Sequence, residues 1–190
     1  MVGLGNPGPE FAGTRHNVGA DTVTLLAGRH GGRLRSEKGL HSQACVVNIG
    51  GRRVLLATPS IYMNESGLAV TELLRRAGVA PDAVATRLIV VHDELDLPPA
   101  RVKLKAGGGN AGHNGLKSIE NHLRTNDYLR VRIGIGKPPG RQSGAAFVLK
   151  RPGAAERDLL AVAVTEAAEA VEAVLSEGIE LAMNRVNTAP

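Results

Sequence analysis

The chain has 190 residues, of which 43% are apolar and 22% charged, and its formal net charge at pH 7 is +5. This length supports one domain with a substantial core, and no apolar run approaches the roughly 18 residues that a membrane-spanning helix needs. The first residues lack the basic and apolar regions of a signal peptide. We therefore expect a cytoplasmic protein without membrane contact, whose positive charge favours an anionic partner.

Aromatic residues are scarce, with two Tyr, two Phe and no Trp. Proteins that bind extended single-stranded nucleic acid stack its bases on aromatic side chains, so this composition disfavours that mode of binding. Recognition of a nucleic acid would have to use its phosphates and shape, which favours a structured RNA.

Strand-like and helical patterns alternate along the chain. Strands are expected at residues 44–49, 53–57, 88–91, 102–105 and 128–135, and helices at about 17–29, 64–77, 114–123 and 155–177. This alternation predicts an α/β fold, a single domain over residues 1–190 with a mostly parallel, mixed central sheet flanked by helices. Only Met1 and Val2 precede the first glycine, so the first strand is expected to be short unless further apolar residues precede it.

Two of the expected helices carry apolar residues that should face the core. These are Leu68, Leu73 and Leu74 in the second helix, and Val162, Val171, Val174 and Leu175 in the longest one. The segment 137–144 is rich in Pro and Gly and is expected to be a loop, either a simple connection or a lid.

The segment Gly3-Leu4-Gly5-Asn6-Pro7-Gly8 fits the G-x-G-x-x-G pattern of dinucleotide-binding folds. In those folds the pattern opens directly into a helix, and an acidic residue follows the next strand about 20 positions on. Here Pro7 and Pro9 interrupt the segment and that acidic residue is missing, which disfavours a nucleotide-binding oxidoreductase. The segment is then a plain tight turn, or a turn that presents the side chain of Asn6.

His16 lies where the first helix should begin. The helix dipole disfavours a cation at that end, so a neutral imidazole that can accept a proton is expected there. The alternative is an isolated surface histidine.

His92, Asp93 and Glu94 follow an apolar strand, at the end of the sheet where open α/β folds place their sites. Such a cluster could bind a metal ion. However, consecutive residues of an extended chain point in opposite directions, so the three side chains cannot all reach one ion. We expect no metal.

Two of the expected strands carry basic residues at alternating positions. Separately, two asparagines lie where helices are expected to begin. Lys103 and Lys105 share one face of their strand, as Arg130 and Arg132 share one face of theirs, which a solvated sheet face would also explain. Asn64 and Asn114 each follow a tight segment, where helix capping is the ordinary role of an asparagine.

Taken in order, the segments 3–8, 14–19, 62–67, 92–99, 107–115 and 132–136 resemble the bacterial-type peptidyl-tRNA hydrolase family, over nearly the whole chain. The resemblance implies an esterase that releases tRNA from peptidyl-tRNA without a cofactor. His16 would activate a water molecule, Asp93 would orient His16, and Asn6 would position the water or the ester carbonyl. Phe11 stands where the family commonly has a tyrosine.

The resemblance also implies binding roles. The expected substrate-binding residues, for the peptide and the 3′ end of the tRNA, are Phe11, Met63, Asn64, His113 and Asn114. Lys105 and Arg132, with Lys103 beside them, match the family's grip on the 5′-phosphate of the acceptor stem. A monomer is expected. The main alternative is a non-enzymatic RNA-binding protein on the same fold, like the splicing-factor relatives of the family.

Overall fold

A mixed sheet forms the centre of the molecule. The computed structural model describes residues 1–188, and this part contains seven strands in the order β2-β3-β4-β1-β5-β7-β6. The strands are β1 (Val2–Gly3), β2 (Arg35–Glu37), β3 (Ser42–Ile49), β4 (Arg52–Pro59), β5 (Ile89–Glu94), β6 (Val102–Ala106) and β7 (Leu129–Gly134). The central pairs β4–β1, β1–β5 and β5–β7 are parallel, whereas β2, β3 and β6 join antiparallel. The expected mostly parallel, mixed sheet is confirmed.

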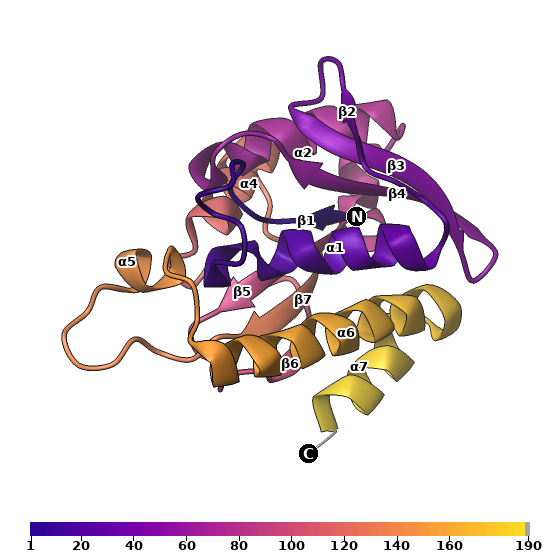
Figure 1. The fold of residues 1–190 in the computed structure, drawn as a ribbon. Helices are drawn as coiled ribbons and strands as arrows, with labels where there is room; N and C mark the ends of the chain where they lie inside the picture. The colour runs from indigo at the N-terminus through magenta and orange to yellow at the C-terminus, as the bar shows by residue number, and fades with distance from the viewer. Residues whose placement is uncertain (189–190) are drawn as a thin grey trace.

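Helices cover both faces of the sheet (Figure 1). One face carries α1 (Val18–Arg29) and α6 (Ala154–Glu177), and the other carries α2 (Ser66–Arg76) and α4 (Asn114–Leu123). Shorter elements are η1 (Arg15–Asn17), η2 (Met63–Glu65), η3 (Pro81–Ala83), α3 (Val84–Arg87) and α5 (Gly144–Val148). No helix in the described part of the chain is both long and apolar enough to cross a membrane.

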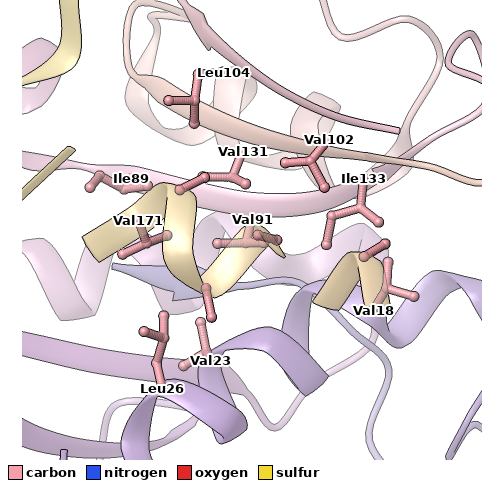
Figure 2. Close-up of a cluster of buried hydrophobic side chains, with 14 of the residues drawn as sticks. Val18, Val23, Leu26, Ile89, Val91, Val102, Leu104, Val131, Ile133 and Val171 are labelled. Carbon is pink, nitrogen blue, oxygen red and sulfur yellow. The ribbon is translucent and has the colours of Figure 1, made fainter. Parts of the chain in front are cut away.

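Successive side chains of a strand point to opposite faces of the sheet, so the core consists of two clusters, one on each face. Ile89, Val91, Val131 and Ile133 point toward α1 and α6 (Figure 2), whereas Val90 points toward α2 and α4. Because helices cover both faces, the inner strands are apolar on both sides, as their sequences indicate.

The last helix, α7 (Ile179–Thr188), protects an edge of the sheet. The Asn187 side chain accepts a hydrogen bond from the Leu104 N–H at 2.8 Å and donates one to the Leu104 carbonyl at 3.0 Å. These bonds occupy backbone groups of the edge strand β6, which would otherwise be open to pairing with another chain.

Close contact between α1 and the sheet sets where this helix begins. A Cβ atom at Gly19 would overlap the Val91 carbonyl, and one at Gly3 would overlap the Gly19 carbonyl. The Ala20 N–H, in the first turn of α1, donates to the Leu4 carbonyl at 2.9 Å. The start of α1 is therefore held at the carboxyl ends of β1 and β5.

Several local expectations are wrong. Leu68 and Val162 are 38% and 56% exposed, because α2 and α6 are rotated so that neighbouring residues face the sheet, in α6 mainly a stripe of alanines. Asn64 does not cap α2, since it lies inside η2 and the cap position falls on Glu65. The exposed, polar β2 and the short α7 had no clear sequence signal. By contrast, α4 spans the expected residues 114–123.

Candidate active site

Three side chains from distant parts of the chain meet at the carboxyl end of β5. His16 comes from η1, directly before α1, Asp93 is the penultimate residue of β5, and His113 is the N-cap of α4. The carboxyl edge of a parallel sheet, where helix N-termini converge, is the usual location of sites in open α/β folds.

One carboxylate oxygen joins the two imidazoles. Asp93 Oδ1 lies 2.8 Å from His16 Nδ1 and 3.0 Å from His113 Nε2, and the two rings are 4.8 Å apart between centroids. Asp93 is 2% exposed and His16 6%. The sequence placed His16 and Asp93 at suitable ends of their elements, and the structure brings them into direct contact.

The hydrogen-bond partners define where the protons lie. Burial alone would raise the pKa of Asp93, but the electrostatic effects of His113 and His16 and the hydrogen bonds from their N–H groups outweigh burial and hold that pKa well below its usual range. Asp93 is therefore a carboxylate and can only accept hydrogen bonds. His16 consequently donates from Nδ1, which leaves the Nε2 lone pair as its basic atom.

His113 and Asp93 belong, with His16, to a group whose possible ligand atoms all lie within 4.8 Å of one another. A metal on His113 Nε2 would require the ring proton to move to Nδ1, which already accepts the Gly115 N–H at 3.1 Å. The helix cap therefore makes this group a poor metal site.

His92 precedes Asp93 in β5, so its side chain points to the other face of the strand. Its Nδ1 donates to the Asp93 carbonyl at 2.7 Å, and its ring meets the His113 ring edge-on at 5.2 Å between centroids. Burial, and then the electrostatic effect of the neighbouring His113, lower the pKa of His92 to about 3, so the His92 ring is neutral. The three consecutive residues His92, Asp93 and Glu94 do not converge on one point, as expected from their spacing.

Asn6 is held by three hydrogen bonds. Its backbone N–H donates to Asn17 Oδ1 at 2.9 Å and its carbonyl accepts from Asn17 Nδ2 at 3.0 Å, while its side-chain oxygen accepts the Met63 N–H at 2.8 Å. The oxygen is thus engaged and the amide NH2 is the group that the turn presents. The role of Asn17 was missed, although its position next to His16 was a possible signal.

The remaining candidates for substrate binding are Met63, Phe11, Asn64 and Asn114. Met63 is buried, and its sulfur occupies the space that a side chain at Gly115 would need. Phe11 contacts the Tyr62 ring edge-on, with centroids 6.3 Å apart. Asn64 and Asn114 are exposed, and neither caps a helix. Capping, the ordinary alternative to substrate binding for both asparagines, is therefore wrong: the caps of α2 and α4 are Glu65 and His113.

The basic residues of β6 and β7 are brought together by the strand register, which pairs Lys103 with Arg132 and Lys105 with Arg130. They do not form a uniformly solvated face. Arg130 is buried and donates to the carbonyls of Gly108, Gly109 and Asn126, so it supports the glycine-rich loop before α4.

Arg132 also has a partner, since its Nε lies 3.1 Å from Glu94 Oε2. Its side chain is 21% exposed, and Lys103 and Lys105 are half-buried. Lys105 and Arg132 are diagonal neighbours across the two strands, close enough for long side chains to contact the same anion.

Arg15, next to His16, has a structural role that the sequence did not indicate. Its Nε donates to Glu156 Oε1 at 2.6 Å, its Nη1 donates to the Lys150 carbonyl at 3.0 Å, and its guanidinium lies 4.1 Å from the centroid of the Phe147 ring. These contacts tie η1 to α5 and to the start of α6.

Comparison with known proteins decides between the enzyme and the RNA-binding alternative. The family model described as peptidyl-tRNA hydrolase matches residues 1–190. The chain belongs to the peptidyl-tRNA hydrolase family. Relatives named peptidyl-tRNA hydrolase support the enzyme. That of Nocardia farcinica is 52% identical over 187 residues, which cover 98% of this chain and 95% of the relative. That of Cutibacterium acnes is 46% identical over 198 residues, which cover 99% and 97%.

Solved structures of the peptidyl-tRNA hydrolase family have the same fold. The crystal structure of peptidyl-tRNA hydrolase from Acinetobacter baumannii matches this chain with a TM-score of 0.90 and 38% identity, covering 98% of this chain and 93% of that one. The expected α/β fold and hydrolase activity are confirmed at the level of the family.

Proposed function

We propose that this protein hydrolyses the ester bond between the peptide and the 3′-terminal ribose of peptidyl-tRNA, with His16 as general base. The observation that carries this proposal is the 2.8 Å hydrogen bond between His16 Nδ1 and Asp93 Oδ1. It leaves Nε2 as a proton acceptor, and the carboxylate stabilises the imidazolium that forms when the proton is taken.

The chemistry needs only water, His16, Asp93 and Asn6. His16 Nε2 removes a proton from a water molecule while the oxygen of that water attacks the ester carbonyl carbon. The tetrahedral intermediate then collapses, the bond to the ribose oxygen breaks, and His16 returns the proton to that oxygen. The amide NH2 of Asn6 donates a hydrogen bond to the carbonyl oxygen or to the water, and stabilises the developing charge.

Substrate binding is assigned to the surroundings of this group. Phe11, Met63, Asn64, His113 and Asn114 are proposed to bind the peptide and the terminal adenosine. Lys105 and Arg132, with Lys103, are proposed to bind the 5′-phosphate of the acceptor stem. Every residue proposed for these roles comes from one chain, and we propose that the protein acts as a monomer in the cytoplasm.

Replacing the base tests this proposal. We expect His16→Ala to lower hydrolysis of peptidyl-tRNA by about 10²–10⁴-fold, the usual contribution of a positioned base, while tRNA binding changes little. Hydrolysis is measured as release of free tRNA, and binding as the dissociation constant of the protein for tRNA. The control is His30→Ala at the other end of α1, where the histidine bonds to Glu172. Near-normal turnover in His16→Ala would falsify the role of His16.

A further inference from the structure

His113 uses its two ring nitrogens for different partners. Nδ1 accepts the Gly115 N–H at 3.1 Å and the Leu116 N–H at 3.4 Å, while Nε2 lies 3.0 Å from Asp93 Oδ1. We propose that His113 is a positioning residue for the reaction, which holds the Asp93 carboxylate against His16 by a hydrogen bond whose direction the α4 cap enforces. This role goes beyond substrate contact and rests on the proposed function.

The cap determines the tautomer of His113. An N-cap side chain accepts hydrogen bonds from the second and third backbone N–H groups of the helix, which here belong to Gly115 and Leu116. A proton on Nδ1 would point at these two donors. The single proton of the neutral ring is therefore on Nε2, where it is donated to Asp93.

The hydrogen bond from His113 is a second contact that fixes the orientation of the Asp93 carboxylate. The same oxygen accepts from His16 at 2.8 Å and from His113 at 3.0 Å, and the carboxylate is 2% exposed. A buried carboxylate needs donors in place of water. With His113 present, Asp93 cannot rotate away from His16 without losing a charge-assisted hydrogen bond.

The ring of His113 has little freedom. It lies between His16 and His92, at centroid distances of 4.8 Å and 5.2 Å. Gly115 lies against it, since a Cβ at that position would lie 3.1 Å from His113 Cε1. The ring is thus a rigid connection between the N-terminus of α4 and the Asp93 carboxylate.

A positioning role predicts effects that substrate contact does not. Without the His113 donor, Asp93 is a freer and stronger acceptor for His16. The imidazolium form is then favoured, so the acidic limb of the pH–rate profile moves to higher pH and kcat falls. Loss of a substrate contact alone would raise KM and leave the limb in place.

Two amide variants test separately the two hydrogen-bonding roles of the His113 ring, as the cap of α4 and as a donor to Asp93. In His113→Asn the side-chain oxygen takes the place of Nδ1 and keeps the cap, but no donor reaches Asp93. In His113→Gln the amide NH2 takes the place of Nε2 and keeps the donor, but the cap is lost. Peptidyl-tRNA hydrolysis is measured against pH for wild type and both variants, together with their melting temperatures.

We expect His113→Asn to melt as wild type does, with kcat lowered roughly 10- to 100-fold by misplacement of the base and the acidic limb at higher pH. His113→Gln should melt at lower temperature, with the limb in the wild-type position. The proposal is overturned if His113→Asn raises only KM, or if both variants shift the limb alike. If wild type does not cleave peptidyl-tRNA, the proposed function is wrong, but this result does not test the hydrogen bond from His113 to Asp93. The tautomer of His113, measured by long-range ¹H–¹⁵N NMR without substrate, still tests the present proposal, and a proton on Nδ1 would refute it.

Discussion

Asp93 is the residue on which the proposed chemistry depends, because it is buried and yet ionised. Its oxygen accepts from His16 and His113, and these contacts outweigh the effect of burial, which alone would raise the pKa of Asp93. A neutral amide of the same shape cannot replace the charge. It can also turn an N–H toward His16 and favour the wrong tautomer.

We therefore expect Asp93→Asn to reduce turnover of peptidyl-tRNA well below the wild-type rate with little change in thermal stability. The measurements are kcat and the melting temperature at neutral pH. Trapping of a covalent peptidyl-aspartate intermediate in wild type would contradict a role for Asp93 in orienting His16.

The lowered pKa of His92 should make the stability of the protein depend on pH. Desolvation, and then the electrostatic effect of the neighbouring His113, lower its pKa from 6.5 to about 3 in the folded protein. The unfolded chain then binds a proton that the folded protein does not, so stability falls as pH decreases from 6.5 toward 3. The slope for one proton is about 1.4 kcal/mol per pH unit.

The variant His92→Asn tests this effect, because its amide can still donate to the Asp93 carbonyl but does not titrate. Between pH 4 and 6 its free energy of unfolding, measured by denaturant titration, should depend on pH less steeply than that of wild type, by about one proton. Equal slopes would mean that His92 is already protonated in the folded protein.

At the scale of elements, the β6–β7 pair brings Lys105 and Arg132 onto one face as diagonal neighbours. Arg132 also pairs with Glu94 Oε2 at 3.1 Å, so a phosphate would have to share this arginine with a carboxylate. A terminal phosphate monoester carries more charge than an internal diester, which allows the end of the tRNA to be selected without reading a base.

Removal of Lys105 or Arg132 should weaken tRNA binding for all sequences alike. The slope of the logarithm of the binding constant against the logarithm of the salt concentration should become shallower by about 0.7–0.9 per lost contact. The Lys105→Ala, Arg132→Ala double variant should barely distinguish tRNA with a 5′-phosphate from tRNA without one. A matched control, Arg75→Ala with Arg76→Ala, removes the same charge from the exposed end of α2. If the first double variant discriminates as strongly as wild type, the phosphate binds elsewhere.

At the scale of the whole molecule, we expect activity without any metal. The His113 cap opposes metal binding at the His16, Asp93 and His113 group, and ester hydrolysis needs only a base, water and donors to the oxyanion. Activity should therefore survive prolonged treatment with EDTA followed by dialysis, when tRNA folding is controlled separately. Loss of activity that zinc restores would show that the cap does not prevent binding.

The sequence alone was sufficient for features that depend on local pattern. Alternation of strands and helices predicted the α/β class, and the helix over residues 114–123 was placed correctly because its pattern lies between clear turn signals. The order of the motifs indicated the family and singled out His16 and Asp93 as candidates. Rotation of a helix about its axis is not local information, which is why Leu68 and Val162 were placed in the core and are exposed.

Only the tertiary structure decided which side chains meet. His16 and Asp93 are 77 residues apart, and Arg15 and Glu156 are 141 apart. The contact between His16 and Asp93 depends on how α1 packs against β1 and β5, through the close approach at Gly3 and Gly19. The tautomer of His113 likewise follows from a helix start and a strand end that are adjacent only in the fold, because a hydrogen bond depends on position in space rather than on sequence spacing.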